Sequence, residues 1–344
     1  MIQPHGGNIH DYPNTLDFSA NINPLGMPDS VHEAIVSSVS QCNHYPDPYC
    51  KQIRSKMSAL LHFPEDQIVF GNGAADLIYR IVHALRPKHA LICAPGFSEY
   101  SHALQEVHCE IHEHFLSSES DFILDRSIFN DFTNEIEMIV LCSPNNPTGQ
   151  LISQSLLRDI SEYCRLHYIT LLLDESFLSF VISGSSNSLL PYIHEHCIIL
   201  NSFTKMYAIP GIRIGYALCG SNYIASKLQQ TGQYWAVSIP AQAAAYAALD
   251  ETDYAVKTAL YIASEREFMT KELSNHGIRV FPSSANYLLI YYESDFAEAM
   301  LKQSILIRDC QNYHGLSNQY YRIAIRLHDD NLALISAIKR YQNG

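Results

Sequence analysis

Polar side chains in the middle of the sequence stand where apolar runs end, and together they could do chemistry. Lys205 lies in "NSFTKMYAIPGIRIGY", between two segments that read as buried strands, and Arg213 follows it in the same stretch. Asp174 ends the run "LLLD", and Asn146 lies in the turn-rich stretch "SPNNPTG". Open α/β sheets bind ligands at the carboxyl ends of their strands. We therefore expect these side chains to share one site.

Each of these residues also has a plain structural alternative. A lysine usually extends its amine to water, a carboxylate at a strand end can cap a helix, and asparagines in a turn need no ligand. Arg213 is more informative, because an arginine between "GI" and "IG" on a buried strand is costly without an anion to meet it. Each signal is modest alone, and their order along one chain favours a common function.

The stretch "GNGAAD", Gly71 to Asp76, adds a place for a phosphate group. It follows an apolar run and opens a helix-like segment, where small residues let backbone N–H groups approach an anion. Phe97 in "APGFSEY" adds an aromatic plane. Pyridoxal 5′-phosphate (PLP) needs an amine, a carboxylate, an amide, a phosphate cradle and a stacking surface. The sequence therefore predicts a PLP site centred on Lys205 and Asp174.

Strands and helices alternate around these residues, which predicts an α/β lobe with a mostly parallel sheet. After about Ser238 the pattern changes to a long helical region broken near positions 250–253. Strands and a closing helix from about Asn331 follow. We read this part as a smaller α+β lobe, completed by the N-terminal segment. We assign residues 45–238 to the large PLP-binding domain, and residues 1–44 with 239–344 to the small one. The runs that we read as strands are "QIVFGNG", "HALICAPG", "EMIVLCSPNNPTG", "YITLLLDES", "CIILNSF", "IRIGYALC", "IRVFPSSANYLLIYY", "ILIRDC" and "YYRIAIRL".

Composition excludes several classes of function. A formal charge of −13 argues against sequence-independent nucleic-acid binding, which needs a basic surface. Nine cysteines without a C-x-x-C pair predict free thiols in a reducing cytoplasm. "HEH" occurs twice, but without H-E-x-x-H or paired cysteines we predict no metal site. No apolar run approaches the ~20 residues that cross a bilayer, and the N-terminus lacks the features of a signal peptide. We therefore expect a soluble, cytoplasmic protein.

The order "GNGAAD", "APGFSEY", "SPNNPTG", "LLLDESF", "SFTKMYAIPGIRIGY" resembles the fold-type I, class I/II aminotransferase superfamily over nearly the whole chain. The resemblance implies a mostly parallel seven-stranded sheet in the large lobe, and a homodimer with shared active sites. It implies that Lys205 bonds PLP, that Asp174 pairs with the ring nitrogen and that Asn146 contacts the ring hydroxyl O3′. The other cofactor contacts that it implies are Gly73, Ala74, Ala75, Phe97, Phe177, Ser202, Thr204, Arg213 and, toward the neighbouring subunit's phosphate, Tyr45.

The two ends resemble a narrower family, the L-threonine-O-3-phosphate decarboxylases of cobalamin biosynthesis. The matching stretches are "HGGNIHDYPNTLDFSANINPLGMP" and "ILIRDCQNYHGLSNQYYRIAIR". This resemblance implies loss of CO₂ from threonine phosphate, giving (R)-1-aminopropan-2-ol O-2-phosphate, with Lys205 as the acid that protonates Cα. A substrate with two anionic groups needs at least two cationic anchors, and we expect Arg308 to take the phosphate. The substrate contacts that the resemblance implies are His5, Gly6, Asn21, Asn146, Arg308 and Arg322.

Three alternatives stay open at this point. Histidinol-phosphate aminotransferases share the central motifs, although they usually carry a tyrosine where this chain has Phe177. A decarboxylase acting on serine phosphate differs by one methyl group, worth roughly 1 kcal/mol in an apolar pocket. A PLP-fold protein without catalysis is disfavoured by the presence of Asp174 and Lys205. The sequence also leaves open residual transamination, the role of Arg326, and how the N-terminal segment closes over the site.

Overall fold

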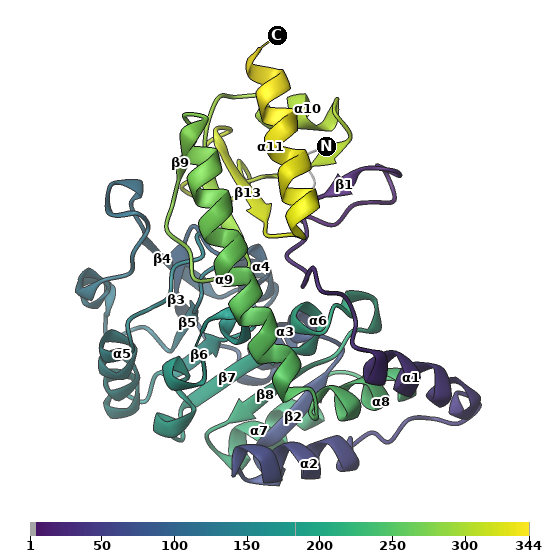
Figure 1. Ribbon diagram of the computed structural model, residues 1–344. Helices are drawn as coiled ribbons and strands as arrows, with labels where there is room; N and C mark the ends of the chain where they lie inside the picture. The colour runs from purple at the N-terminus through teal and green to yellow at the C-terminus, as the bar shows by residue number, and fades with distance from the viewer. Residues whose placement is uncertain (1–4, 183, 344) are drawn as a thin grey trace.

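A computed structural model describes residues 5–182 and 184–343 (Figure 1). Its largest sheet has seven strands in the order β2-β8-β7-β6-β5-β3-β4. Strands β4, β3, β5, β6 and β7 are parallel, and β8 is antiparallel to both β7 and β2. The predicted mostly parallel sheet is therefore confirmed. The strands are β2 (Ile68–Gly71), β3 (His89–Ala94), β4 (Glu110–Phe115), β5 (Met138–Cys142), β6 (Thr170–Asp174), β7 (Cys197–Ser202) and β8 (Gly215–Cys219).

Helices cover both faces of this sheet, which explains why its central strands are continuous apolar runs. Helices α3, α4 and α7 share one buried cluster with the sheet, and α2, α5 and α8 share a second cluster on the other face. The helices are α2 (Lys51–Leu61), α3 (Ala74–Leu85), α4 (Ser98–Glu106), α5 (Gln154–Leu166), α6 (Phe203–Met206), α7 (Asn222–Gln230) and α8 (Ile239–Ala248). Short 3₁₀ turns are η1 (Val39–Gln41), η2 (Glu65–Gln67), η3 (Ser118–Ser120), η4 (Arg126–Asp131), η5 (Leu178–Phe180), η6 (Gly184–Asn187), η7 (Leu190–Tyr192) and η8 (Pro210–Ile212).

A separate four-stranded antiparallel sheet has the order β12-β13-β10-β9. The N-terminal strand β1 pairs in parallel with β11, so the start of the chain joins its C-terminal part. A third buried cluster lies here and includes Phe18, Tyr287 and residues of α9 and α11. The elements are β1 (Leu16–Asp17), β9 (Arg279–Val280), β10 (Tyr287–Tyr291), β11 (Ile305–Leu306), β12 (Arg308–Asp309), β13 (Tyr320–Ala324), α1 (Asp29–Ser38), α9 (Thr252–Asn275), α10 (Phe296–Leu301) and α11 (His328–Gln342).

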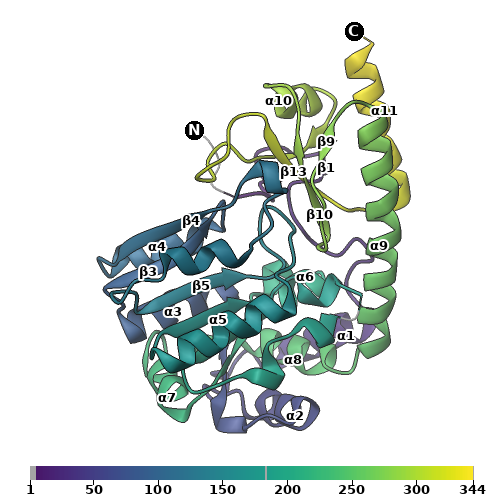
Figure 2. The same cartoon turned by 90° about the vertical axis from the view of Figure 1, so that its left-hand side faces the viewer.

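The predicted break in the long helical region is confirmed, since α8 ends at Ala248 and α9 begins at Thr252. Figures 1 and 2 show α9 running beside both sheets, from α8 at one end to β9 at the other. None of the helices in the described part of the chain is long and apolar enough to cross a membrane.

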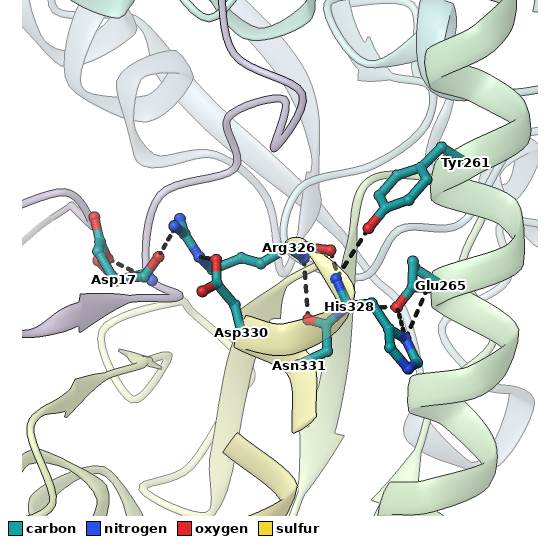
Figure 3. A network of polar contacts seen from close by, with 8 residues as sticks. Asp17, Tyr261, Glu265, Arg326, His328, Asp330 and Asn331 are labelled. Atoms are coloured by element: carbon teal, nitrogen blue, oxygen red, sulfur yellow. Dashed lines mark hydrogen bonds and ion pairs between the residues drawn. The ribbon is translucent and has the colours of Figure 1, made fainter. Parts of the chain in front are cut away.

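Two arginines do not lie on the strands where the sequence analysis placed them. Strand β8 begins at Gly215, so Arg213 precedes it, exposed and in the left-handed region at φ 61°. Strand β13 ends at Ala324, so Arg326 lies beyond it, although the run "YYRIAIRL" placed this residue on the strand. Arg326 instead contacts Asp330 and the backbone oxygen of Asp17, at 3.0 and 2.9 Å, where β1 meets α11 (Figure 3). Its contacts are thus structural ones.

Candidate active site

Lys205 and Asp174 lie at the ends of neighbouring elements of the large sheet. Asp174 is the last residue of β6, and Lys205 lies in α6, directly after β7, which pairs with β6. Burial lowers the pKa of the Lys205 amine, and the Asp174 carboxylate opposes that shift. A lowered pKa increases the fraction of neutral amine, which is the nucleophilic form. The Lys205 nitrogen lies 5.7 Å from the ring centroid of Phe177.

Two hydrogen bonds fix the buried Asp174 carboxylate. The backbone N–H of Ser176 donates to Oδ1 at 2.8 Å, and the Tyr100 hydroxyl donates to Oδ2 at 2.7 Å. Burial, helped by the charge of Asp174, raises the pKa of Tyr100 well above its usual value, so this hydroxyl keeps its proton. Sequence analysis missed Tyr100, although it stands at the end of "APGFSEY", one helical turn after Phe97.

We expect Tyr100→Phe to slow turnover about tenfold or more. The variant removes only the hydroxyl that holds Asp174, and a hydrogen bond to a charged group is worth about 1.5–3 kcal/mol. Steady-state kinetics would measure the loss, and the PLP dissociation constant would report cofactor binding separately. Tyr341→Phe is a matched control, because that hydroxyl donates to the exposed Glu293 carboxylate instead. Equal effects of the two substitutions would contradict a role for Tyr100 at Asp174.

A phosphate cradle forms where α3 begins beside β8. Gly73 precedes the helix at φ 88°, and no side chain caps its first N–H groups, which include Ala74 and Ala75. A Cβ on Gly73 would lie 2.5 Å from Arg213 Nη2, and one on Gly215 would lie 2.7 Å from the Ala74 nitrogen. Only glycine therefore permits this close approach. Unpaired N–H groups at a helix N-terminus together with a guanidinium are a natural site for a phosphate.

Ser202 and Thr204 add hydroxyl groups at the same place. Ser202 pairs with Gly215 across β7 and β8, and Gly215 pairs with Gly71 across β8 and β2. The two hydroxyl oxygens lie 2.7 Å apart, and Ser202 also accepts from the Thr204 backbone N–H at 3.2 Å. The structure thus brings together the predicted phosphate contacts of this chain.

Phe97, Asn146 and Phe177 lie around the Lys205–Asp174 pair. Phe97 precedes α4, and its ring contacts Tyr100 edge to face at 5.6 Å between centroids. Asn146 is buried after β5, and its Oδ1 accepts from Arg322 Nη1 at 2.6 Å. Phe177 packs edge to face on Tyr287 at 5.0 Å. Because Asn146 Oδ1 accepts this hydrogen bond from Arg322, the side-chain nitrogen Nδ2 of Asn146 points away from the Arg322 guanidinium.

Arg308 and Arg322 stand directly opposite each other on β12 and β13. Their side chains are 4 and 5% exposed. Arg322 donates to Asn146 and to the Ser19 carbonyl, and Arg308 donates to the Asn312 amide oxygen at 2.6 Å. Like charges placed directly opposite on paired strands repel each other. An anion between or beside the two guanidinium groups would offset that repulsion.

Tyr313 lies beside Arg308 and Arg322, and the sequence analysis did not predict it as a site residue. Its hydroxyl lies 3.4 Å from Asn146 Oδ1 and 3.4 Å from Arg322 Nη1. Its ring lies 5.6 Å from the Arg308 guanidinium. The sequence signal was available, because Tyr313 falls inside "ILIRDCQNYHGLSNQYYRIAIR".

The N-terminal segment folds back beside Phe97, which answers a question that the sequence left open. His5 Nε2 lies 2.8 Å from Glu99 Oε1, and its ring centroid lies 5.7 Å from that of Phe97. Gly6 packs so closely on Ser19 that a Cβ would lie 2.1 Å from the Ser19 carbonyl oxygen. Asn21 is buried, and its Oδ1 has no hydrogen-bond partner among the described residues. These residues reach the neighbourhood of Arg322, which also contacts Ser19.

Among the predicted site residues, Tyr45 is the one that does not join the others within this chain. Its side chain is 76% exposed and stacks on Trp235, with ring centroids 4.3 Å apart. The remaining donor set fits PLP: a buried amine, a strand-end carboxylate, an aromatic plane, and a glycine-lined cradle that a Cβ would fill.

Comparisons with known proteins agree with this geometry. The sequence profile of the family described as "Aminotransferase class I and II" matches residues 13–338. The threonine-phosphate decarboxylase of Salmonella typhimurium is 34% identical, over 99% of this chain and 97% of that protein. An adenosylcobalamin biosynthesis bifunctional protein of Leptospira interrogans is 31% identical over 98% of this chain, which spans 41% of that longer protein. The histidinol-phosphate aminotransferase structure from Clostridium acetobutylicum has a TM-score of 0.89 at 29% identity, covering 95% of this chain and 99% of its own. With its fold, its strand-end site and these matches, the chain belongs to the class I and II aminotransferase family.

Proposed function

We propose that this chain is a PLP-dependent carboxy-lyase that removes CO₂ from L-threonine O-3-phosphate and forms (R)-1-aminopropan-2-ol O-2-phosphate. This is the linker chemistry of the cobalamin nucleotide loop. The observation that carries the proposal is the buried pair Arg308 and Arg322, opposite each other on β12 and β13. A substrate with both a phosphate and a carboxylate supplies two anionic groups for two guanidinium groups. The 34% identity to a threonine-phosphate decarboxylase along the whole chain supports the same substrate.

The side chains of this protein divide the chemical tasks among themselves. PLP, when bound, supplies an electron sink for the electron pair that remains at Cα after CO₂ leaves. Lys205 holds the cofactor through its amine, and later delivers a proton from Nζ to Cα. Asp174 keeps a proton on the ring nitrogen, and Tyr100 and Ser176 fix the carboxylate in place.

Substrate orientation decides which bond at Cα breaks, and the arginines control that orientation. Arg308 holds the phosphate, while Arg322, positioned by Asn146 and Ser19, holds the carboxylate. His5, Gly6 and Asn21 border the site on the N-terminal side, where His5 contacts Phe97, Gly6 packs on Ser19, and Asn21 Oδ1 is buried without a partner among the described residues. Phe177 offers an apolar ring where an aminotransferase usually places a tyrosine hydroxyl.

The alternative activity is transamination of histidinol phosphate, which the structural likeness to such an enzyme keeps in view. Incubating the PLP-loaded protein with phosphothreonine, and measuring CO₂ and 2-oxo-acid together, separates the two. We expect CO₂ without a 2-oxo product. Transamination of histidinol phosphate at the higher kcat/KM would overturn the proposal. Assaying phosphoserine in parallel measures discrimination by one methyl group, and we expect kcat/KM to be near tenfold higher for phosphothreonine than for phosphoserine.

Arg308→Ala is expected to lower kcat/KM for phosphothreonine more than tenfold, to raise KM, and to leave PLP affinity nearly unchanged. Truncating one partner of a desolvated charge pair costs about 2–5 kcal/mol. Arg213 and the start of α3 serve the cofactor phosphate separately, so the cofactor keeps its own contacts.

Unphosphorylated threonine is the internal control for Arg308, because it never uses that contact. The loss is expected to be smaller for threonine than for phosphothreonine. An equal loss on both substrates would contradict this assignment, and the phosphate contacts would then be assigned to His5, Asn21 and Arg322. Arg326→Ala is a matched surface control, because its guanidinium contacts Asp330 and Asp17 (Figure 3).

The proposal includes a cytoplasmic homodimer in which Tyr45 reaches the cofactor phosphate of the neighbouring subunit. Tyr45 and Trp235 stack on each other and are exposed in the single chain, and exposed apolar surface of this kind supports a subunit interface at this place. The cysteines, all free in the structure, support a reducing compartment. Light scattering that gives only monomers at micromolar concentration would contradict the dimer.

A further inference from the structure

Three potential metal ligands meet on the outer strands of the large sheet. His89 begins β3, and Glu110 and His112 lie on the edge strand β4. His89 stands directly opposite Glu110, and His112 is opposite Leu91. Successive side chains of a strand alternate between the two faces. All three side chains therefore project from one face of the sheet.

The ligand atoms of these residues are already spaced as a bound ion requires. His89 Nδ1 lies 3.4 Å from His112 Nε2 and 3.7 Å from Glu110 Oε2, and His112 Nε2 lies 3.8 Å from Glu110 Oε1. Tetrahedral zinc with bonds of about 2.0–2.2 Å places its ligand atoms roughly 3.3–3.6 Å apart. The two distances to Glu110 run to different carboxylate oxygens, so the carboxylate has to rotate to place one oxygen toward both imidazoles when the ion binds.

The donor set also indicates which ion. Two imidazoles and one carboxylate suit Zn²⁺ and its neighbours in the first transition row, whereas Mg²⁺ and Ca²⁺ prefer oxygen ligands. The imidazole side chains are 25 and 30% exposed and the carboxylate is 66% exposed, so an ion can enter from solvent. A chain of net charge −13 attracts cations.

The other histidines and acidic residues near this group pair with different partners. His114 pairs with Asp131 at 2.6 Å, and Glu113 pairs with His314 at 2.6 Å, so the rest of the first "HEH" has other partners. In the second "HEH", the rings of His194 and His196 lie 6.3 Å apart. Within the described residues, His89, Glu110 and His112 are the one group of three such ligands that converge.

We propose that His89, Glu110 and His112 form a site for one divalent transition-metal ion, with Zn²⁺ the favoured occupant. The site lies where β3 and β4 begin, whereas Lys205 and Asp174 lie where strands of the same sheet end. The ion is therefore separate from the PLP chemistry. It joins the edge strand β4 to β3, and completes its coordination with water.

Calorimetric titration of the PLP-loaded protein with ZnCl₂ tests this site, after dialysis to remove free PLP and other chelators. A Cys42→Ser background removes the exposed thiol as a competing ligand. We expect one Zn²⁺ per protomer, with an increase in melting temperature. His89→Ala is expected to weaken binding by more than about tenfold, since even losing an outer-shell partner typically costs 10–100-fold in metal affinity.

The second "HEH" supplies the matched control. His196→Ala removes a partly buried histidine from an equivalent sequence motif and is expected to leave zinc affinity unchanged. Glu110→Gln keeps the size of an exposed side chain, so it tests the carboxylate without disturbing packing. Zinc binding that survives both His89→Ala and Glu110→Gln, or that His196→Ala abolishes, would overturn the proposal. Absence of stoichiometric binding to the parent protein would overturn it as well.

Discussion

Lys205→Ala is expected to lower turnover of phosphothreonine by on the order of 10⁴-fold or more, the scale typical of losing a covalent catalytic residue. In the proposed reaction this residue would have two tasks, because it would bond the cofactor and return a proton to Cα. Its amine is buried, and burial lowers its pKa. The alanine variant still has the phosphate cradle of Gly73, Ser202 and Arg213, so it is expected to bind PLP without a covalent link.

Borohydride reduction followed by mass spectrometry tests the attachment directly. The parent protein is expected to gain the mass of reduced PLP on the peptide that contains Lys205, and the variant to gain none. The absorbance band of lysine-bound PLP is expected to disappear as well. Lys227→Ala is a control, because that lysine contacts the ring of Tyr223 on α7. A reduced covalent adduct on the Lys205→Ala protein would show that the lysine assignment is wrong.

Asp174→Ala is expected to bind the cofactor and yet lose about 10²-fold or more in kcat. In the proposed mechanism Asp174 would hold a proton on the ring nitrogen, and without that proton the cofactor would be a poorer electron sink. Removing one preorganised electrostatic partner typically costs ~10²–10³-fold in rate. The expected loss is larger than that of Tyr100→Phe, because Tyr100 acts only through this carboxylate.

Single-turnover kinetics separate this effect from a loss of cofactor. At saturating PLP the Asp174→Ala variant is expected to remain slow, which places the defect in chemistry. Combining it with Tyr100→Phe is expected to add little, because the hydroxyl then has no carboxylate to hold. Wild-type turnover by Asp174→Ala would remove the residue from the mechanism.

The residues that follow apolar runs were predictable from sequence, and the contacts between distant strands were not. Asp174 ends β6 and Gly73 precedes α3. Both positions could be predicted, because a continuous apolar run indicates a buried strand and the first polar or turn-forming residues after it indicate where the strand ends. The break between α8 and α9 was visible for a similar reason, since "LDETD" interrupts the helical pattern. Such local features need no knowledge of which strands are neighbours.

The failures share a physical cause, because each depended on register or on where a strand stops. Arg326 belongs to the run "YYRIAIRL" that we read as a strand, but β13 ends before it and its guanidinium pairs with Asp330. Tyr100 meets Asp174 across 74 positions of sequence. "EIHEHF" was not read as a strand because it is polar, yet it forms the edge strand β4. The convergence of its side chains with His89 follows from pairing that no local pattern reveals.

The opposed arginines have a consequence for how the catalytic cycle proceeds. Strands β12 and β13 hold the backbones of Arg308 and Arg322 directly opposite each other, so both guanidinium groups stay in the same part of the site whichever ligand is bound. In the proposed reaction the substrate carries two anionic groups, while the product retains the phosphate and has lost its carboxylate as CO₂. One guanidinium then loses its partner, at a cost of about 2–5 kcal/mol for a desolvated pair. The same pair that favours substrate capture therefore weakens product binding, so decarboxylation itself promotes product release.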